Sequence, residues 1–115
     1  MNVLVVATSS PYGSDGTANA LRLAAALVLR GEWVDIFLMG DGVYAARRGQ
    51  DPGTLAASVE LQVNEVVGKG ARLTLCGTCC RSRGIQAADV VDGARLGTVH
   101  DLAALSVSAD RVVSL

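Results

Sequence analysis

Apolar residues recur along the chain in two alternating patterns. Short runs of consecutive apolar residues predict strands buried on both faces, and the segments between them have the spacing of helices with one buried face. The five predicted strands are residues 3–7, 33–39, 72–75, 94–96 and 111–114. Because helices separate the strands, the connections are crossovers, which produce a parallel sheet covered on both faces. The pattern therefore predicts one α/β domain over residues 1–115.

Capping and turn residues set the expected limits of the helices. Thr17 is the predicted N-cap of the first helix, and Gly31 ends that helix after Arg30. Thr98 and Asp101 have the spacing of a capping box, which opens the last helix. The other predicted helices are residues 43–47, a helix that carries Leu55, Val59, Val63, Val66 and Val67, and residues 85–91.

Composition adds expectations about assembly, partners and location. Of the 115 residues, 50% are hydrophobic and only 18% are charged, so we expect apolar surface to be buried between subunits of an oligomer. The net charge of −1 and the lack of a basic patch argue against nucleic acid. No apolar run approaches the about 20 residues that span a bilayer, and no basic segment precedes the first apolar run. A cytoplasmic protein without membrane contact is expected.

The three cysteines of the chain, Cys76, Cys79 and Cys80, lie within five residues directly after the third predicted strand. In open parallel sheets, ligands and chemistry gather outside the carboxyl ends of the strands. The loops at residues 9–16 and 40–42 are expected to share this edge. The sequence therefore predicts sulfur chemistry at the carboxyl edge of the sheet.

Several neighbours of Cys76 favour a reactive thiolate. Arg81 and Arg83 supply positive charge, and the helix expected to begin near Ile85 supplies free N–H groups. Cys79 completes a C-x-x-C pair, and its thiol can resolve a persulfide or a mixed disulfide on the first cysteine. The pattern is consistent with a sulfur carrier or with a thiol-redox module.

Other interpretations of these residues stay open. Free cysteines are often small buried hydrophobic residues, in which case the chain would be a non-catalytic structural or regulatory subunit of an assembly, and C-x-x-C is a common half-site for zinc. A zinc site would need carboxylates or a neighbouring subunit, since His100 is the only other nitrogen or sulfur ligand and has the setting of a surface residue. The loop at residues 9–16 either cradles an anion or simply connects strand to helix, and it matches no nucleotide motif. Asp41 has the setting of an exposed turn carboxylate.

Four segments in order along the whole chain give it a specific resemblance to the DsrE/DsrF/TusD sulfur-relay family. They are Pro11-Tyr12-Gly13, the run Phe37-Leu38-Met39-Gly40-Asp41-Gly42-Val43-Tyr44, the segment from Leu75-Cys76-Gly77-Thr78-Cys79 to Arg83-Gly84, and Asp110-Arg111-Val112-Val113. The resemblance implies a DsrEFH-like three-layer α/β/α sandwich with a five-stranded parallel sheet in the order 4-3-2-1-5. It also implies a homo-oligomer, as trimer or hexamer, or a hetero-oligomer with DsrF/DsrH-like subunits.

The resemblance further implies that Cys76 carries sulfur as a persulfide, because an Arg-Gly pair follows it at the family's distance. Cys79 is at most its auxiliary, and Cys80 has no clear counterpart. The implied supporting residues are Arg83, Gly84, Tyr12, Gly13 and Asp41. The implied partners are sulfur donor and acceptor proteins, with no metal and no cofactor. The family serves both transfer-RNA thiolation and sulfur oxidation, and the sequence leaves the pathway open.

Overall fold

The computed structural model describes residues 1–54 and 56–115, and it contains one five-stranded parallel sheet. The strands are β1 (Asn2–Ala7), β2 (Trp33–Leu38), β3 (Arg72–Cys76), β4 (Ala94–Gly97) and β5 (Arg111–Ser114). Their order across the sheet is β4-β3-β2-β1-β5, and every neighbouring pair is parallel. This confirms the expected architecture and strand order.

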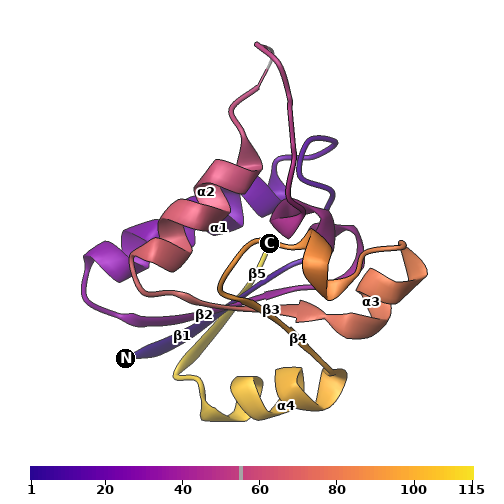
Figure 1. Ribbon diagram of the computed structural model, residues 1–115. Coiled ribbons are helices and arrows are strands. Elements are labelled where there is room, and N and C mark those ends of the chain that lie inside the picture. Colours follow the sequence, from indigo (N-terminus) through magenta and orange to yellow (C-terminus); the bar gives the residue numbers. More distant parts are fainter. Residues whose placement is uncertain (55) are drawn as a thin grey trace.

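Helices cover both faces of the sheet, as Figure 1 shows. The helices α1 (Gly16–Leu29) and α2 (Val59–Gly68) lie on one face, and α4 (Val99–Ser108) lies on the other. The six-residue helix α3 (Gly77–Ser82) lies at the carboxyl edge, next to the end of β3. Two 3₁₀ segments complete the chain, η1 (Gly40–Ala46) and η2 (Ala87–Asp89). No helix in the described part of the chain is long and apolar enough to cross a bilayer.

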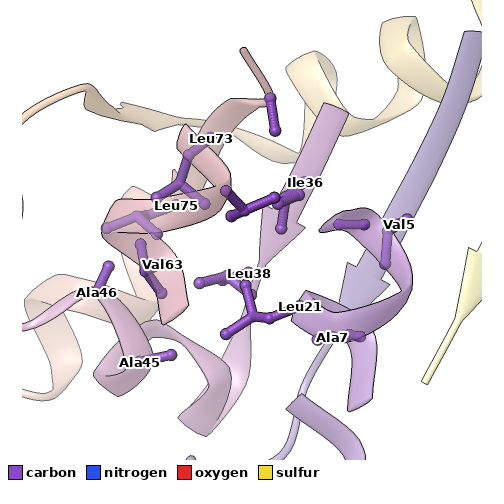
Figure 2. Close-up of a cluster of buried hydrophobic side chains, with 14 of the residues drawn as sticks. Val5, Ala7, Leu21, Ile36, Leu38, Ala45, Ala46, Val63, Leu73 and Leu75 are labelled. Atoms are coloured by element: carbon purple, nitrogen blue, oxygen red, sulfur yellow. The ribbon is translucent and has the colours of Figure 1, made fainter. Parts of the chain in front are cut away.

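The larger core lies between the sheet and the α1–α2 layer. Figure 2 shows side chains of the central strands meeting side chains of both helices; those labelled are Val5, Ala7, Leu21, Ile36, Leu38, Ala45, Ala46, Val63, Leu73 and Leu75. Each is at most 2% exposed. A smaller cluster of Leu4, Val6 and Phe37 lies on the opposite face, with Leu102 and Leu105 of α4 packed against it. Burial on both faces fixes the central strands and therefore the edge where they end.

The prediction of a helix at residues 85–91 is wrong, and the helix after β3 is α3, which ends before residue 85. Gly84 has a φ of +69°, a left-handed conformation that ends α3. The backbone beyond it pairs with the segment after η1, since Val91 N–H donates to Ala46 O (2.9 Å) and Arg48 N–H donates to Asp89 O (2.8 Å). These bonds occupy groups that a continuing helix would need, so only the short η2 turn forms.

The expected cap of the first helix is also wrong. Thr17 lies inside α1 and is fully buried. Its N–H donates to Ser9 Oγ (3.0 Å) and its hydroxyl donates to Ser9 O (2.6 Å), so the side chain of Ser9 provides the acceptor at the helix start. This arrangement fastens the loop after β1 to the first turn of α1.

The remaining helix starts follow ordinary capping chemistry. Ser58 caps α2, so that helix begins at Val59, and Leu55 of the expected helix lies outside the described residues. Thr98 and Asp101 form the predicted capping box at the start of α4. The short helix expected at residues 43–47 is the longer 3₁₀ segment η1.

Candidate functional site

Cys76 joins β3 to α3. It is the last residue of the strand and the N-cap of the helix, and its sulfur accepts a hydrogen bond from Cys79 N–H (3.3 Å). Gly77 follows because space is short there: a Cβ at this position would lie 3.2 Å from Gly97 O of the neighbouring strand β4. The sulfur thus takes the place of the oxygen acceptor that usually caps a helix.

Cys79 lies in the first turn of α3 and faces the loop after β2. Its sulfur accepts a hydrogen bond from the N–H of Gly40, the first residue of η1 (3.2 Å). Gly40 has a φ of +56°, a conformation that favours glycine. A backbone N–H that follows β2 therefore points at a thiol that follows β3.

The end of β1 reaches the same place, through a close contact with Gly42 of η1. A Cβ at Gly42 would lie 2.6 Å from Ala7 O, so η1 packs backbone to backbone against the end of β1. The ends of β1, β2 and β3 therefore converge, which confirms the expectation that these loops share the carboxyl edge.

Arg83 and Asp41 form an ion pair beside the thiols. Arg83 Nε donates to Asp41 Oδ1 (2.8 Å), and Arg83 Nη1 donates to Cys79 O (3.1 Å) and to Ser82 Oγ (3.0 Å). The side chain of Arg83 is 26% exposed and that of Asp41 is 58% exposed. Asp41 is thus an exposed turn carboxylate that also links η1 to the end of α3.

The surroundings of the two thiols shift the pKa values of Cys76 and Cys79 in opposite directions. Burial raises the pKa of Cys76, and the hydrogen bond that its S–H makes to Cys79 raises it further. Burial also acts to raise the pKa of Cys79, but the hydrogen bonds from Cys76 and from Gly40 N–H, with the charge of Arg83, outweigh it and lower that pKa. The first negative charge of the pair therefore resides on Cys79, with the proton on Cys76.

Cys80 differs from the other two cysteines. Its side chain is 1% exposed within the larger core, and burial raises its pKa. Cys76 and Cys79 are both partly exposed. Within residues 1–54 and 56–115, no three His, Cys, Asp or Glu side chains are gathered closely enough to hold a metal ion. The interpretation of a buried hydrophobic cysteine fits Cys80, while the other two thiols can be reached from outside.

Tyr12 and Gly13 follow β1, and their hydrogen bonds go to residues other than the cysteines. The Tyr12 hydroxyl donates to Gln50 Oε1 and accepts from Val59 N–H (3.0 Å), which ties the loop after β1 to the start of α2. Gly13 N–H donates to Ser10 Oγ (3.2 Å). In the described part of the chain neither residue hydrogen-bonds to a cysteine.

Three features of the site were not evident from the sequence. The contact of Gly40 N–H with the Cys79 sulfur joins residues far apart in the chain, and only the position of Gly40 directly after β2 hints at it. Arg81, counted among the charges near the thiol, instead points its guanidinium to Thr78 Oγ1 (3.4 Å). The N–H donor for Cys76 comes from α3 and not from a helix at Ile85.

Comparison with known proteins agrees with the fold and the motifs. The model of the DsrE/DsrF-like family matches residues 1–115. The chain is 40% identical over 114 residues to the uncharacterized protein MJ0989 of Methanocaldococcus jannaschii, covering 99% of each chain. It is 37% identical over 114 residues to protein YchN of Escherichia coli, covering 97% of each.

Solved structures show the same architecture. The crystal structure of YchN from E. coli superposes with a TM-score of 0.94 at 35% identity, covering 100% of this chain and 99% of the other. MTH1491 of Methanobacterium thermoautotrophicum shares the fold, with a TM-score of 0.70 at 16% identity, covering 99% and 97%. With the family model matched from end to end, this chain belongs to the DsrE/DsrF-like family.

Proposed function

We propose that this chain is a sulfur carrier, which accepts sulfane sulfur from a donor protein as a persulfide on Cys76 and passes it to an acceptor protein. The observation that carries the proposal is the pair of partly exposed thiols, Cys76 and Cys79, with a backbone N–H directed at each sulfur. Sulfur exchange proceeds through thiolate attack, and this pair favours a thiolate. Membership of the DsrE/DsrF-like family supports the same function.

The loading step uses both thiols. The pKa of Cys79 is lowered and that of Cys76 is raised, so Cys79 is the first of the two thiols to lose its proton. Cys76 passes its proton to the Cys79 sulfur along their hydrogen bond and attacks the outer sulfur of the donor persulfide. A bond forms between Cys76 Sγ and that sulfur, the S–S bond of the donor breaks, and the donor leaves as a thiolate. The exchange is redox-neutral and needs no external oxidant or reductant.

Delivery can follow two routes. An acceptor thiolate can take the outer sulfur from Cys76 by the same exchange. Alternatively the Cys79 thiolate attacks Cys76 Sγ, an S–S bond forms between the two cysteines, and hydrosulfide leaves. The second route leaves the pair oxidised by two electrons, and a dithiol protein must reduce it before the next cycle. The reducing cytoplasm, where we place the protein, supplies such dithiols.

The test is transfer of radiolabelled sulfur from a cysteine desulfurase that bears a labelled persulfide. Variants Cys76→Ser, Cys79→Ser and Cys80→Ser are compared after each has been shown to fold. Transfer should vanish in Cys76→Ser, fall or stay level in Cys79→Ser, and persist in Cys80→Ser, whose thiol is buried. Transfer to Cys76→Ser at the rate of the parent, with none to Cys79→Ser, would identify Cys79 as the carrier instead.

We further propose that the carrier acts as a homo-oligomer, a trimer or a hexamer, or together with DsrF/DsrH-like subunits. Apolar side chains on the outer surface of α4 support this, since Val99 is 64% and Val107 88% exposed. Leu96 of β4 and Val112 of β5 add exposed apolar area on the two edge strands, at 42% and 51%. Burial of such area between subunits would be favourable.

A further inference from the structure

We propose that Asp41 and Arg83 are positioning residues, which hold the Gly40 N–H against the Cys79 sulfur and so keep the negative charge of the thiol pair on Cys79. The use of that thiolate in catalysis rests on the proposed sulfur transfer, but its formation does not. The proposal gives Asp41 a role in the site although it touches neither sulfur.

The Asp41–Arg83 ion pair links the segment that donates the Gly40–Cys79 hydrogen bond to the segment that accepts it. Asp41 directly follows Gly40, and Arg83 lies one turn after Cys79. Arg83 binds the Asp41 carboxylate with Nε (2.8 Å) and the Cys79 carbonyl with Nη1 (3.1 Å). The guanidinium therefore fixes the distance between the residue that carries the sulfur and the residue next to the N–H that is directed at it.

A purely electrostatic role for Arg83 does not explain the hydrogen bonds that its guanidinium makes. In the described part of the chain, no hydrogen bond joins the guanidinium to a cysteine sulfur, and its Nε and Nη1 are occupied by Asp41, Cys79 O and Ser82 Oγ. Its charge is also paired with that of Asp41, which reduces the field that reaches the thiol. The charge contributes to the acidity of Cys79, and the hydrogen bond from Gly40 contributes beside it.

The groups that face Cys79 come from each element packed around it. Cys76 at the end of β3, Cys80 within α3 and Arg83 after α3 interact with the Cys79 thiol itself, while Asp41 and Tyr44 of η1 interact with Arg83. Asp41 is the one carboxylate in this set. The negative charge of Asp41 by itself disfavours a thiolate on Cys79. Replacing Asp41 therefore distinguishes positioning from charge repulsion, because the two roles predict shifts of opposite sign in the pKa of Cys79.

The segment can lose the ion pair and remain folded. Gly42 packs against Ala7 O, and Met39 N–H, directly before η1, donates to Ala7 O (3.1 Å), so the start of η1 stays attached to the end of β1. Asp41 is more than half exposed and its replacement leaves no cavity. Only the alignment of the Gly40 N–H with the Cys79 sulfur is expected to loosen.

The experiment is the rate of iodoacetamide alkylation of Cys79 as a function of pH, mapped by mass spectrometry, in the parent, Asp41→Asn and Arg83→Lys. Positioning predicts that Asp41→Asn raises the pH midpoint and slows alkylation of Cys79 at neutral pH by about three- to tenfold. Removal of a nearby negative charge without positioning predicts the opposite shift. Arg83→Lys keeps the charge but cannot make both bonds, so it should resemble Asp41→Asn.

Arg81→Gln is the matched control, because Arg81 lies on α3 beside the same thiols and its guanidinium bonds only Thr78 among the described residues. It should leave the Cys79 midpoint where it is in the parent. The Gly40 amide resonance in ¹⁵N–¹H spectra should follow the Cys79 titration in the parent and lose that response in Asp41→Asn. An unchanged or lowered midpoint in Asp41→Asn, or an equal shift in Arg81→Gln, would overturn the proposal. Alkylation needs no sulfur donor, so this result is independent of whether the chain carries sulfur.

Discussion

At the scale of single residues, the proposed chemistry depends on two sulfurs, of which Cys79 loses its proton before Cys76. Each sulfur accepts a backbone N–H, from Cys79 in one case and from Gly40 in the other. Because the thiols interact, their titration belongs to the pair, and the charge is unequally divided between them. The division favours Cys79, the cysteine next to Arg83.

Alkylation of the parent protein should therefore reach Cys79 before Cys76 as the pH rises. The pKa of Cys79 is lowered, so its alkylation rate should rise through a midpoint below that of an ordinary thiol, while that of Cys76 should rise later. In Cys79→Ala, the hydrogen bond and like charge that raise the pKa of Cys76 are gone, and the Cys76 midpoint should fall. Mass-mapped alkylation checks both, and an unchanged Cys76 midpoint in Cys79→Ala would refute the coupling.

Gly42 is the residue whose substitution should affect stability most directly at this edge. A Cβ there meets the carbonyl of Ala7, a backbone atom that cannot move aside, so Gly42→Ala should lower the free energy of unfolding by about 1–3 kcal/mol. Gly68→Ala is the control, since a Cβ at that helix position meets nothing and alanine favours the helix by up to about 1 kcal/mol. Urea denaturation measures both, and equal stability of Gly42→Ala and the parent would contradict the packing.

At the scale of elements, the sequence predicted what depends on local pattern. Strands buried on both faces stand out as apolar runs, and the capping box of Thr98 and Asp101 follows from spacing. The helix α3 was missed because it is short and its cap is the sulfur of Cys76, an unusual cap residue. The apolar residues Ile85 and Val90 resemble a helix face, but the backbone around them is paired with the segment after η1.

The same reasoning explains what was predictable in the site. Cys76 and Cys79 stand out from composition and from their position after a strand. The bonds of Gly40 to Cys79 and of Asp41 to Arg83 join distant parts of the chain, and only the folded sheet brings their partners together. Whether a turn residue such as Asp41 faces solvent alone or also a partner cannot be judged from local spacing.

The cap of α4 should contribute measurably to stability. Thr98 Oγ1 accepts from the N–H groups of His100 (3.2 Å) and Asp101 (3.4 Å), so Thr98→Ala should lower the free energy of unfolding by about 1 kcal/mol. Ser106→Ala is a control, since its hydroxyl donates to Leu102 O within the helix and caps nothing. Denaturation curves for both variants test this, and similar losses in the two would contradict a specific role of the cap.

At the scale of the whole molecule, the two faces of the sheet are unequally covered. The larger core lies under α1 and α2, while α4 alone packs on the other face and contains no fully buried residue. Apolar side chains therefore remain exposed on that helix and on the edge strands. Association of identical subunits is a direct way to cover them.

Light scattering at micromolar concentration should accordingly show a trimer or a hexamer. The apolar surface supports association, and its burial would favour the assembly by the hydrophobic effect. A clean monomer across this concentration range would remove the proposed homo-oligomer while leaving the thiol chemistry of one chain untouched.

The central claim, that this chain carries sulfur on Cys76, is tested most directly by locating the sulfur itself. The parent protein is incubated with a cysteine desulfurase and free cysteine, trapped with iodoacetamide, digested, and the cysteine-containing peptide is fragmented in the mass spectrometer. A carrier role of Cys76 predicts a gain of one sulfur atom on Cys76, with none on Cys80. Absence of any added sulfur on the peptide, or its location on Cys79 alone, would contradict it.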